Sequence, residues 1–226
     1  MISHEYKCIF IHIPKCAGTS IETALGHRND FNGRGAQDHR TIRMIEKPIF
    51  TRYLIRSREN RFEVLRRVKH RFRSGENPRN MLTVTRDQYD RYFKFTIVRN
   101  PWSRAYSWYQ NVMFDELHRQ GRPIDRQTSL YEFLKLYAGR GALRPQVYWL
   151  RRYDGSIQLN YIGRFENLLV DFHNVCKCLK IPAIELPHKV KGAGEDYRLH
   201  YDEDSKELVA NIFREDIETF GYSFEE

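Results

Sequence analysis

A short apolar run near the N-terminus, followed at once by a loop and a helix start, most constrains the fold. Residues 7–13 are apolar and rich in β-branched side chains, and Pro14 ends the run, so we predict a buried strand there. Residues 14–18 form a loop, and residues 19–25 have the pattern of a helix that Gly26 stops. A strand that passes through a short loop into a helix is the building unit of parallel α/β sheets.

Strand and helix patterns alternate along the rest of the chain. We expect further strands over residues 49–55, 81–85, 93–99 and 161–165. The alternation predicts an α/β fold, a parallel sheet flanked by helices, in one domain that covers residues 1–226. Helices are expected over residues 39–46, 58–73, 100–118, 129–138, 167–180 and 203–220, with Asn100, Thr128 and Asp202 as N-caps.

The chain is strongly basic, with a net charge of +9 and a pI of about 9.4. This charge favours an anionic partner, such as nucleic acid, a membrane surface, a phosphorylated cofactor or an acidic polymer, and it also suits a merely solubilising role. Nine Arg or Lys stand against two Glu within residues 52–73. This segment predicts a basic amphipathic helix that receives an acidic acceptor or is a solvated face. Its apolar positions at helical spacing are Phe62, Leu65, Val68 and Phe72.

The cysteines and the apolar runs bear on compartment and metal binding. Cys8, Cys16, Cys176 and Cys178 form no CxxC pair and lack the spacing of a zinc site, so we expect free thiols in a reducing compartment and no metal. No stretch approaches the roughly 20 apolar residues that a membrane-spanning helix needs. We therefore expect a soluble, cytoplasmic protein.

The loop after the first strand has the residues of an anion-binding device. Unpaired backbone N–H groups at a helix start attract negative charge, and Lys15 adds a full positive charge. Thr19 and Ser20 add hydroxyl donors in the first helical turn, and Gly18 lets the backbone approach a phosphate closely. The lysine precedes the glycine, so this is not the G-x-x-x-x-G-K-[ST] pattern of nucleoside triphosphatases.

A second anion site is predicted at the end of the strand at residues 93–99. Arg99 lies where a parallel strand ends, the usual place for ligands in open α/β sheets, and its planar guanidinium suits phosphate oxygens. Pro101 is in the first helical position after Asn100. Ser107 lies two turns into that helix, on the stripe that faces back to the strand end.

These two motifs carry a family resemblance. Residues 11–20 resemble the 5′-phosphosulfate loop of sulfotransferases that use 3′-phosphoadenylyl sulfate (PAPS), closest to the carbohydrate-type branch with heparan and chondroitin sulfotransferases and bacterial relatives. Residues 95–107 resemble the 3′-phosphate motif of that family. The resemblance implies a P-loop-like fold, PAPS as co-substrate and adenosine 3′,5′-bisphosphate (PAP) as product. The donor contacts it implies are Lys15, Cys16, Ala17, Gly18, Thr19, Ser20, Arg99 and Ser107.

The catalytic groups follow from the same resemblance. The segment at residues 38–42 resembles the one that carries a histidine base, so His39 is the expected base and His188 the runner-up; Asp38 or another carboxylate orients it. Lys15 is placed to neutralise the departing phosphate. His12, inside the first strand, is expected to be a satisfied core residue.

Two later segments also look family-like. Residues 189–197 resemble a loop that closes over the 3′-phosphate, with Lys191 and Gly192 as the matching positions. Arg164 either lies near the donor or acceptor or forms an ion pair with Glu166.

Three functions remain open at this point. The first is a sulfotransferase that acts on a hydroxyl of a carbohydrate or small-molecule acceptor, possibly an acidic one, with no nucleic acid as partner. The second is a P-loop nucleotide kinase, although its lysine should follow the second glycine and carboxylates should hold Mg²⁺. The third is a nucleic-acid-binding module, for which no binding motif is recognised. The sequence does not fix the oligomeric state.

Overall fold

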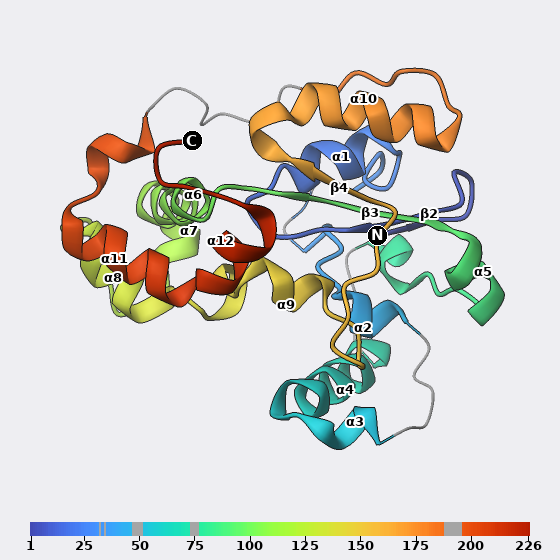
Figure 1. Ribbon diagram of the computed structural model, residues 1–226, viewed down its shortest axis with the longest axis horizontal. Coiled ribbons are helices and arrows are strands. Elements are labelled where there is room, and N and C mark those ends of the chain that lie inside the picture. The colour runs from blue at the N-terminus through green and yellow to red at the C-terminus, as the bar shows by residue number, and fades with distance from the viewer. Residues whose placement is uncertain (32, 34, 47–51, 73–76, 188–195) are drawn as a thin grey trace.

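The computed structural model describes residues 1–31, 33, 35–46, 52–72, 77–187 and 196–226. A four-stranded sheet with the order β1-β2-β3-β4 forms its centre (Figure 1). The short β1 (Ile2–Ser3) is antiparallel to β2 (Cys8–Ile11), whereas β2, β3 (Phe93–Val98) and β4 (Tyr161–Arg164) are parallel. The predicted class, a single-domain α/β fold with a largely parallel sheet between helices, is confirmed.

Alternate residues of the strands supply two separate cores. Cys8, Phe10 and Phe95 pack against α1 (Gly18–Ala24) and α10 (Leu168–Leu179), which cover one face of the sheet (Figure 1). Ile9 and Ile11 belong to the core on the other face, with residues of α2 (Ile42–Ile45) and α9 (Gln146–Leu150). This two-residue period fixes the strand register, because a slip of one residue would exchange the two cores.

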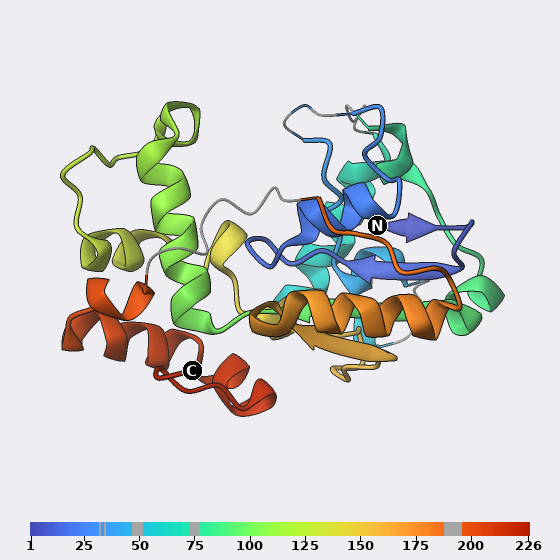
Figure 2. The same cartoon turned by 90° about the horizontal axis from the view of Figure 1, so that it is seen from above.

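A third hydrophobic cluster lies beyond the end of the sheet. It joins α6 (Pro101–Phe114), α8 (Leu130–Tyr137) and α11 (Glu203–Ile212), which group together in Figure 2. Asn100 caps α6 as predicted, since its side chain accepts hydrogen bonds from the amides of Trp102 and Ser103. α6 therefore begins directly after β3 and points its first turns at the strand ends. Further helical elements after α6 in the chain are α7 (Glu116–Arg119), α12 (Arg214–Phe220) and the 3₁₀ turns Gly141–Leu143, Phe165–Asn167 and Tyr197–His200.

Several predicted elements differ from the structure. Residues 81–85 form no strand; a 3₁₀ turn (Pro78–Met81) leads into an extended loop, and Thr85 caps α5 (Arg86–Arg91) through a capping box with Gln88. Of the strand expected over residues 49–55, residues 49–51 lie outside the described residues, and Tyr53–Arg56 forms helix α3. Ser129, not Thr128, caps α8, and the helix expected at residues 203–220 divides at Phe213 into α11 and α12. Asp202 caps α11 as predicted.

The basic helix α4 (Arg58–Arg71) turns its apolar side chains outward. Phe62, Leu65 and Val68 are 42%, 59% and 50% exposed, whereas Asn60 and Glu63 are buried. Glu63 accepts hydrogen bonds from Thr41 and Tyr148, and Asn60 donates to the carbonyls of Tyr53 and Tyr153. A buried polar network, not the apolar stripe, thus holds α4 to the domain.

All four cysteines are free thiols, and Cys178 is exposed while the other three are buried. Within the described part of the chain, no helix combines the length and apolar character needed to cross a membrane.

Candidate active site

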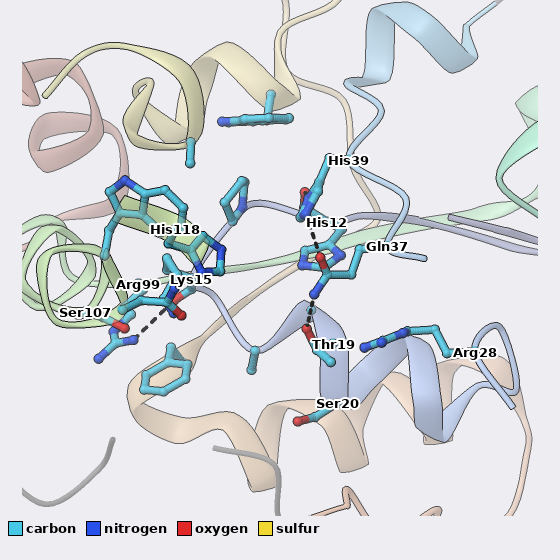
Figure 3. A pocket seen from close by; sticks show the side chains of 18 of the residues that line it. His12, Lys15, Thr19, Ser20, Arg28, Gln37, His39, Arg99, Ser107 and His118 are labelled. Atoms are coloured by element: carbon cyan, nitrogen blue, oxygen red, sulfur yellow. Dashed lines mark hydrogen bonds between the residues drawn. The ribbon is translucent and has the colours of Figure 1, made fainter. Parts of the chain in front are cut away.

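A cavity of about 910 Å³ lies where the carboxyl ends of β2 and β3 meet the first turns of α1 and α6. Figure 3 shows side chains from these elements converging with those of Arg28, Gln37 and His39. None of its described lining residues is an Asp or a Glu. It therefore presents positive and neutral groups to a ligand. Its polar lining residues are His12, Lys15, Thr19, Ser20, Arg28, Gln37, His39, Arg99, Ser107, Asn111 and His118.

The loop between β2 and α1 has a strained backbone. Lys15 and Ala17 have φ angles of 69° and 60°, in the left-handed region that non-glycine residues seldom adopt. No side chain caps α1, and the amides of Ser20 and Ile21 turn back to the carbonyl of Ala17. Strain of this kind gathers at ligand sites and costs roughly 1–3 kcal/mol per residue.

Lys15 is held inside the cavity by α6. Its Nζ donates to Oδ1 of Asn111 at 2.9 Å, and Nδ2 of Asn111 lies 3.2 Å from Nδ1 of His118. Asp115 Oδ2 in turn lies 2.7 Å from that same nitrogen of His118. Burial and the nearby charge of Arg99 lower the pKa of Lys15 to about 8. The amine is therefore mostly protonated at pH 7, but it loses its proton within about one pH unit above neutrality.

Arg99 is fixed by contacts on both its backbone and its side chain. The side chain of Gln146 binds both backbone groups of Arg99. Its Oε1 accepts from the Arg99 amide and its Nε2 donates to the Arg99 carbonyl, both at 2.8 Å. The guanidinium donates to Ser103 Oγ at 2.9 Å and to the carbonyl of Lys15 at 3.1 Å, and it stacks 4.0 Å from the centre of the Phe165 ring. Arg99 therefore links the two predicted anion sites, and Ser107 lines the same cavity one turn beyond Ser103.

Two histidines lie side by side at the other end of the cavity. The rings of His12 and His39 are 4.2 Å apart between centroids. His12 is buried and paired through Nδ1 with Oε1 of Glu22 at 2.9 Å, which confirms it as a satisfied core histidine. Burial and the neighbouring His12 lower the pKa of His39 to about 3, so its imidazole is neutral at pH 7 and is a weaker base than a free histidine.

Asp38 does not orient His39, contrary to one of the two expectations. Its carboxylate is bound by Arg40 at 2.6 Å and by the N-terminal amine at 3.4 Å. The ring nitrogens of His39 instead lie 3.4 Å from the carbonyl of His12 and 3.3 Å from Oε1 of Gln37. Both contacts are long, and neither partner is a carboxylate.

Some predicted donor contacts lie away from the cavity. The Cys16 side chain is buried beside Gln146, and its amide turns back to the carbonyl of Ile13. Arg164 stacks on Tyr222 and pairs with Glu226 at 3.6 Å, so the ion pair considered with Glu166 is wrong. Glu166 is occupied by the amide of Asn100 and the hydroxyl of Tyr222. Lys191, Gly192 and His188 lie outside the described residues.

The structure adds residues that the motifs did not indicate. Gln146 reaches Arg99 from α9, 47 positions along the chain. Asn111 reaches Lys15 from α6, and His118 of α7 contacts Asn111. No local pattern marks Gln146, whereas Asn111 stands one helical turn after Ser107 and Gln37 two residues before His39. Arg28 and the aromatic rings of Trp108 and Trp149 complete the walls.

A parallel α/β sheet whose strand ends carry a lysine loop and an arginine on one cavity is typical of proteins that bind phosphorylated ligands at the strand ends. The model of the sulfotransferase family matches residues 1–223, nearly the whole chain, so this protein belongs to the sulfotransferase family. Sulfuryl transfer is therefore its chemistry, and nothing found favours a kinase. Searches of the curated proteins and of the solved structures returned no match.

Proposed function

We propose that this protein transfers the sulfuryl group of PAPS to a hydroxyl of a carbohydrate or small-molecule acceptor. The observation that carries this proposal is the contact between the two anion sites, where the Arg99 guanidinium donates to the carbonyl of Lys15 at 3.1 Å within one cavity. PAPS carries a phosphosulfate at the 5′ position and a phosphate at the 3′ position. Two adjacent cationic sites, in a cavity of the size usual for such ligands, match that pattern.

The donor contacts divide between the two sites. Lys15 and the first turn of α1, with Thr19 and Ser20, hold the 5′-phosphosulfate; Arg99 and Ser107 hold the 3′-phosphate. Phe165, already stacked on Arg99, gives the adenosine an apolar wall. Ala17 and Gly18 approach through their backbone, as their place in the lining allows. Lys191 and Gly192 remain proposed contacts to the 3′-phosphate.

His39 acts as the base in this proposal. The acceptor oxygen attacks sulfur as the bond between sulfur and the 5′-phosphate oxygen breaks, and His39 takes the acceptor's proton. Its imidazole is neutral at pH 7, the form that a base needs, and burial beside His12 makes it a weaker base than a free histidine, with a pKa near 3. Lys15 offsets the charge that builds up on the departing phosphate. No metal is needed in this scheme.

The acceptor is assigned by class only. Trp108 and Trp149 give the cavity two flat aromatic walls on which a sugar ring can stack. Arg28 adds a cation, and the described lining has no carboxylate that would repel an acidic acceptor. Helix α4 contributes no described residue to this cavity, so nothing favours it as the acceptor site. We therefore place a neutral or acidic carbohydrate or small metabolite here, as in the carbohydrate-type branch.

A ligand-stabilisation assay separates this proposal from the kinase alternative. PAP should raise the melting temperature of the wild-type protein, and ATP with Mg²⁺ should do so less. Arg99→Ala should remove most of the PAP effect, because it deletes the 3′-phosphate contact. Stabilisation by ATP–Mg²⁺ alone would contradict the proposal.

The acceptor class is tested with PAPS labelled in its sulfate. A panel of neutral and acidic hydroxylated sugars and small phenols is incubated with the wild-type protein and with Lys15→Ala. Labelled product is expected with the wild type on at least one sugar. Labelling of phenols alone would overturn the carbohydrate assignment.

A further inference from the structure

A second cavity, of about 440 Å³, lies apart from the active site. Its described lining comes from β1, α2, α4, the segment at residues 81–85 and the first turn of α5. The two cavities share no described lining residue. They are nonetheless joined by consecutive residues, because His39 lines the active site and Arg40 lines the second cavity.

Cations converge on the second cavity. Arg40, Arg67 and Arg71 line it together with His4 and His70, and its described lining includes no Asp or Glu. Burial lowers the pKa of Arg67, and the charges of Arg71 and Arg40 lower it further, as expected for three guanidinium groups brought close together. A bound anion would relieve this repulsion.

Hydrogen-bond donors remain available on this wall. Asp38 and the carbonyl of Leu82 use only some of the five N–H groups of Arg40. His4 is held through Nδ1 by Tyr92 at 2.8 Å, which leaves its other nitrogen for a ligand. The Thr83 hydroxyl and the side-chain nitrogen of Gln88 add neutral donors.

The rest of the wall is apolar. Ile2, Met44, Ile45, Met81 and Val84 face the same space. The volume exceeds what an inorganic phosphate fills, and it falls within the range usual for small organic ligands. The cavity therefore matches a molecule that has an anionic head and an apolar body.

We propose that this second cavity is a binding site for a small organic oxyanion, a phosphate or sulfate monoester with an apolar body. The site does not depend on the function proposed for the first cavity. Arg40, Arg71 and His4 bind the anionic head, and the methionine and isoleucine side chains hold the body. Because Arg40 is also held by Asp38, beside His39, the ligand contacts the segment that carries the proposed base.

Histidines report which cavity a ligand enters. His4 and His70 line the second cavity, and His12, His39 and His118 line the first. Protein labelled with ¹⁵N at histidine is titrated with phenyl phosphate, and each ring signal is assigned by substitution. We expect the His4 and His70 signals to shift at lower ligand concentration than those of the first cavity. Shifts confined to His12, His39 and His118, or no shift at all, would overturn the proposal.

Calorimetry with matched variants tests the cation contacts. Arg71→Ala removes an exposed cation of this wall, and Lys69→Ala removes an exposed cation of the same helix that does not line the cavity. We expect roughly tenfold weaker phenyl phosphate binding for Arg71→Ala, from the loss of a charged hydrogen bond, and no change for Lys69→Ala. Phenol and inorganic phosphate should each bind more weakly than phenyl phosphate. Equal affinities of the Arg71 and Lys69 variants would refute the assignment.

Discussion

Replacing Gly18 by alanine should destabilise the domain through a clash with His12. A Cβ atom at position 18 would lie 1.9 Å from Cδ2 and 2.1 Å from Nε2 of the His12 ring, far inside contact distance. That ring cannot swing away freely, because Nδ1 is bound to Oε1 of Glu22 at 2.9 Å and both side chains are buried. Either the first turn of α1 shifts or the buried pair breaks.

The size and the sign of the effect both follow from this geometry. Without an obstacle, Gly→Ala in a helix stabilises by about 0.5–1 kcal/mol. Here overpacking costs about 1–3 kcal/mol, and breaking the pair of His12 and Glu22 costs about 3–5 kcal/mol. We expect Gly18→Ala to lower the free energy of unfolding by about 3 kcal/mol. A stable domain has only about 5–15 kcal/mol in total.

Urea denaturation of a double-mutant cycle isolates the clash. His12→Ala alone should cost about 3–5 kcal/mol, because it leaves the Glu22 carboxylate buried without its partner. In the double variant the new methyl group occupies space that the imidazole has vacated. The double variant should therefore be about as stable as His12→Ala, which makes the two losses sub-additive by about 2–3 kcal/mol. A stabilising Gly18→Ala, or losses that add within about 0.5 kcal/mol, would refute the reasoning.

Three further predictions concern the active site. The pKa of about 8 for Lys15 means that affinity for PAP, measured by calorimetry, should fall roughly tenfold from pH 7 to pH 9 as the amine loses its proton, and Lys15→Arg should remove this dependence. His39→Ala should keep the wild-type affinity for PAP but lose about 10²–10⁴-fold in turnover, and an unchanged turnover of this variant would exclude His39 as the base. Because the pKa of His39 is about 3, the rate of the wild-type enzyme should not fall as the pH is lowered through 6.5. Gln146→Leu leaves the amide and carbonyl of Arg99 unpaired, so it should lower stability by about 2–4 kcal/mol in urea denaturation and weaken PAP binding.

Features written in a few adjacent residues were predictable from the sequence. The strand before Pro14, the cap at Asn100 and the cap at Asp202 all depend on neighbours within four residues, and the structure confirms them. The placement of Lys15 and Arg99 on one cavity was also predictable, because parallel strands end at the same edge of a sheet.

Features that depend on tertiary contacts were not predictable. The apolar spacing predicted a basic amphipathic helix at α4, but it did not indicate the anchors Asn60 and Glu63, whose partners come from distant parts of the chain. Arg164 matched a family pattern, yet it pairs with the C-terminal residue Glu226. The contact of Gln146 with Arg99 joins two elements that no local pattern relates.

The central claim is that Lys15 and Arg99 together bind a nucleotide phosphorylated at both its 5′ and 3′ positions. Calorimetric titration with PAP and with adenosine 5′-monophosphate, which lacks the 3′-phosphate, tests it most directly. We predict that PAP binds the wild type at least about tenfold more tightly, and that Arg99→Ala abolishes this difference. Equal affinities for the two nucleotides in the wild type, or a preference for PAP that survives in Arg99→Ala, would contradict the claim.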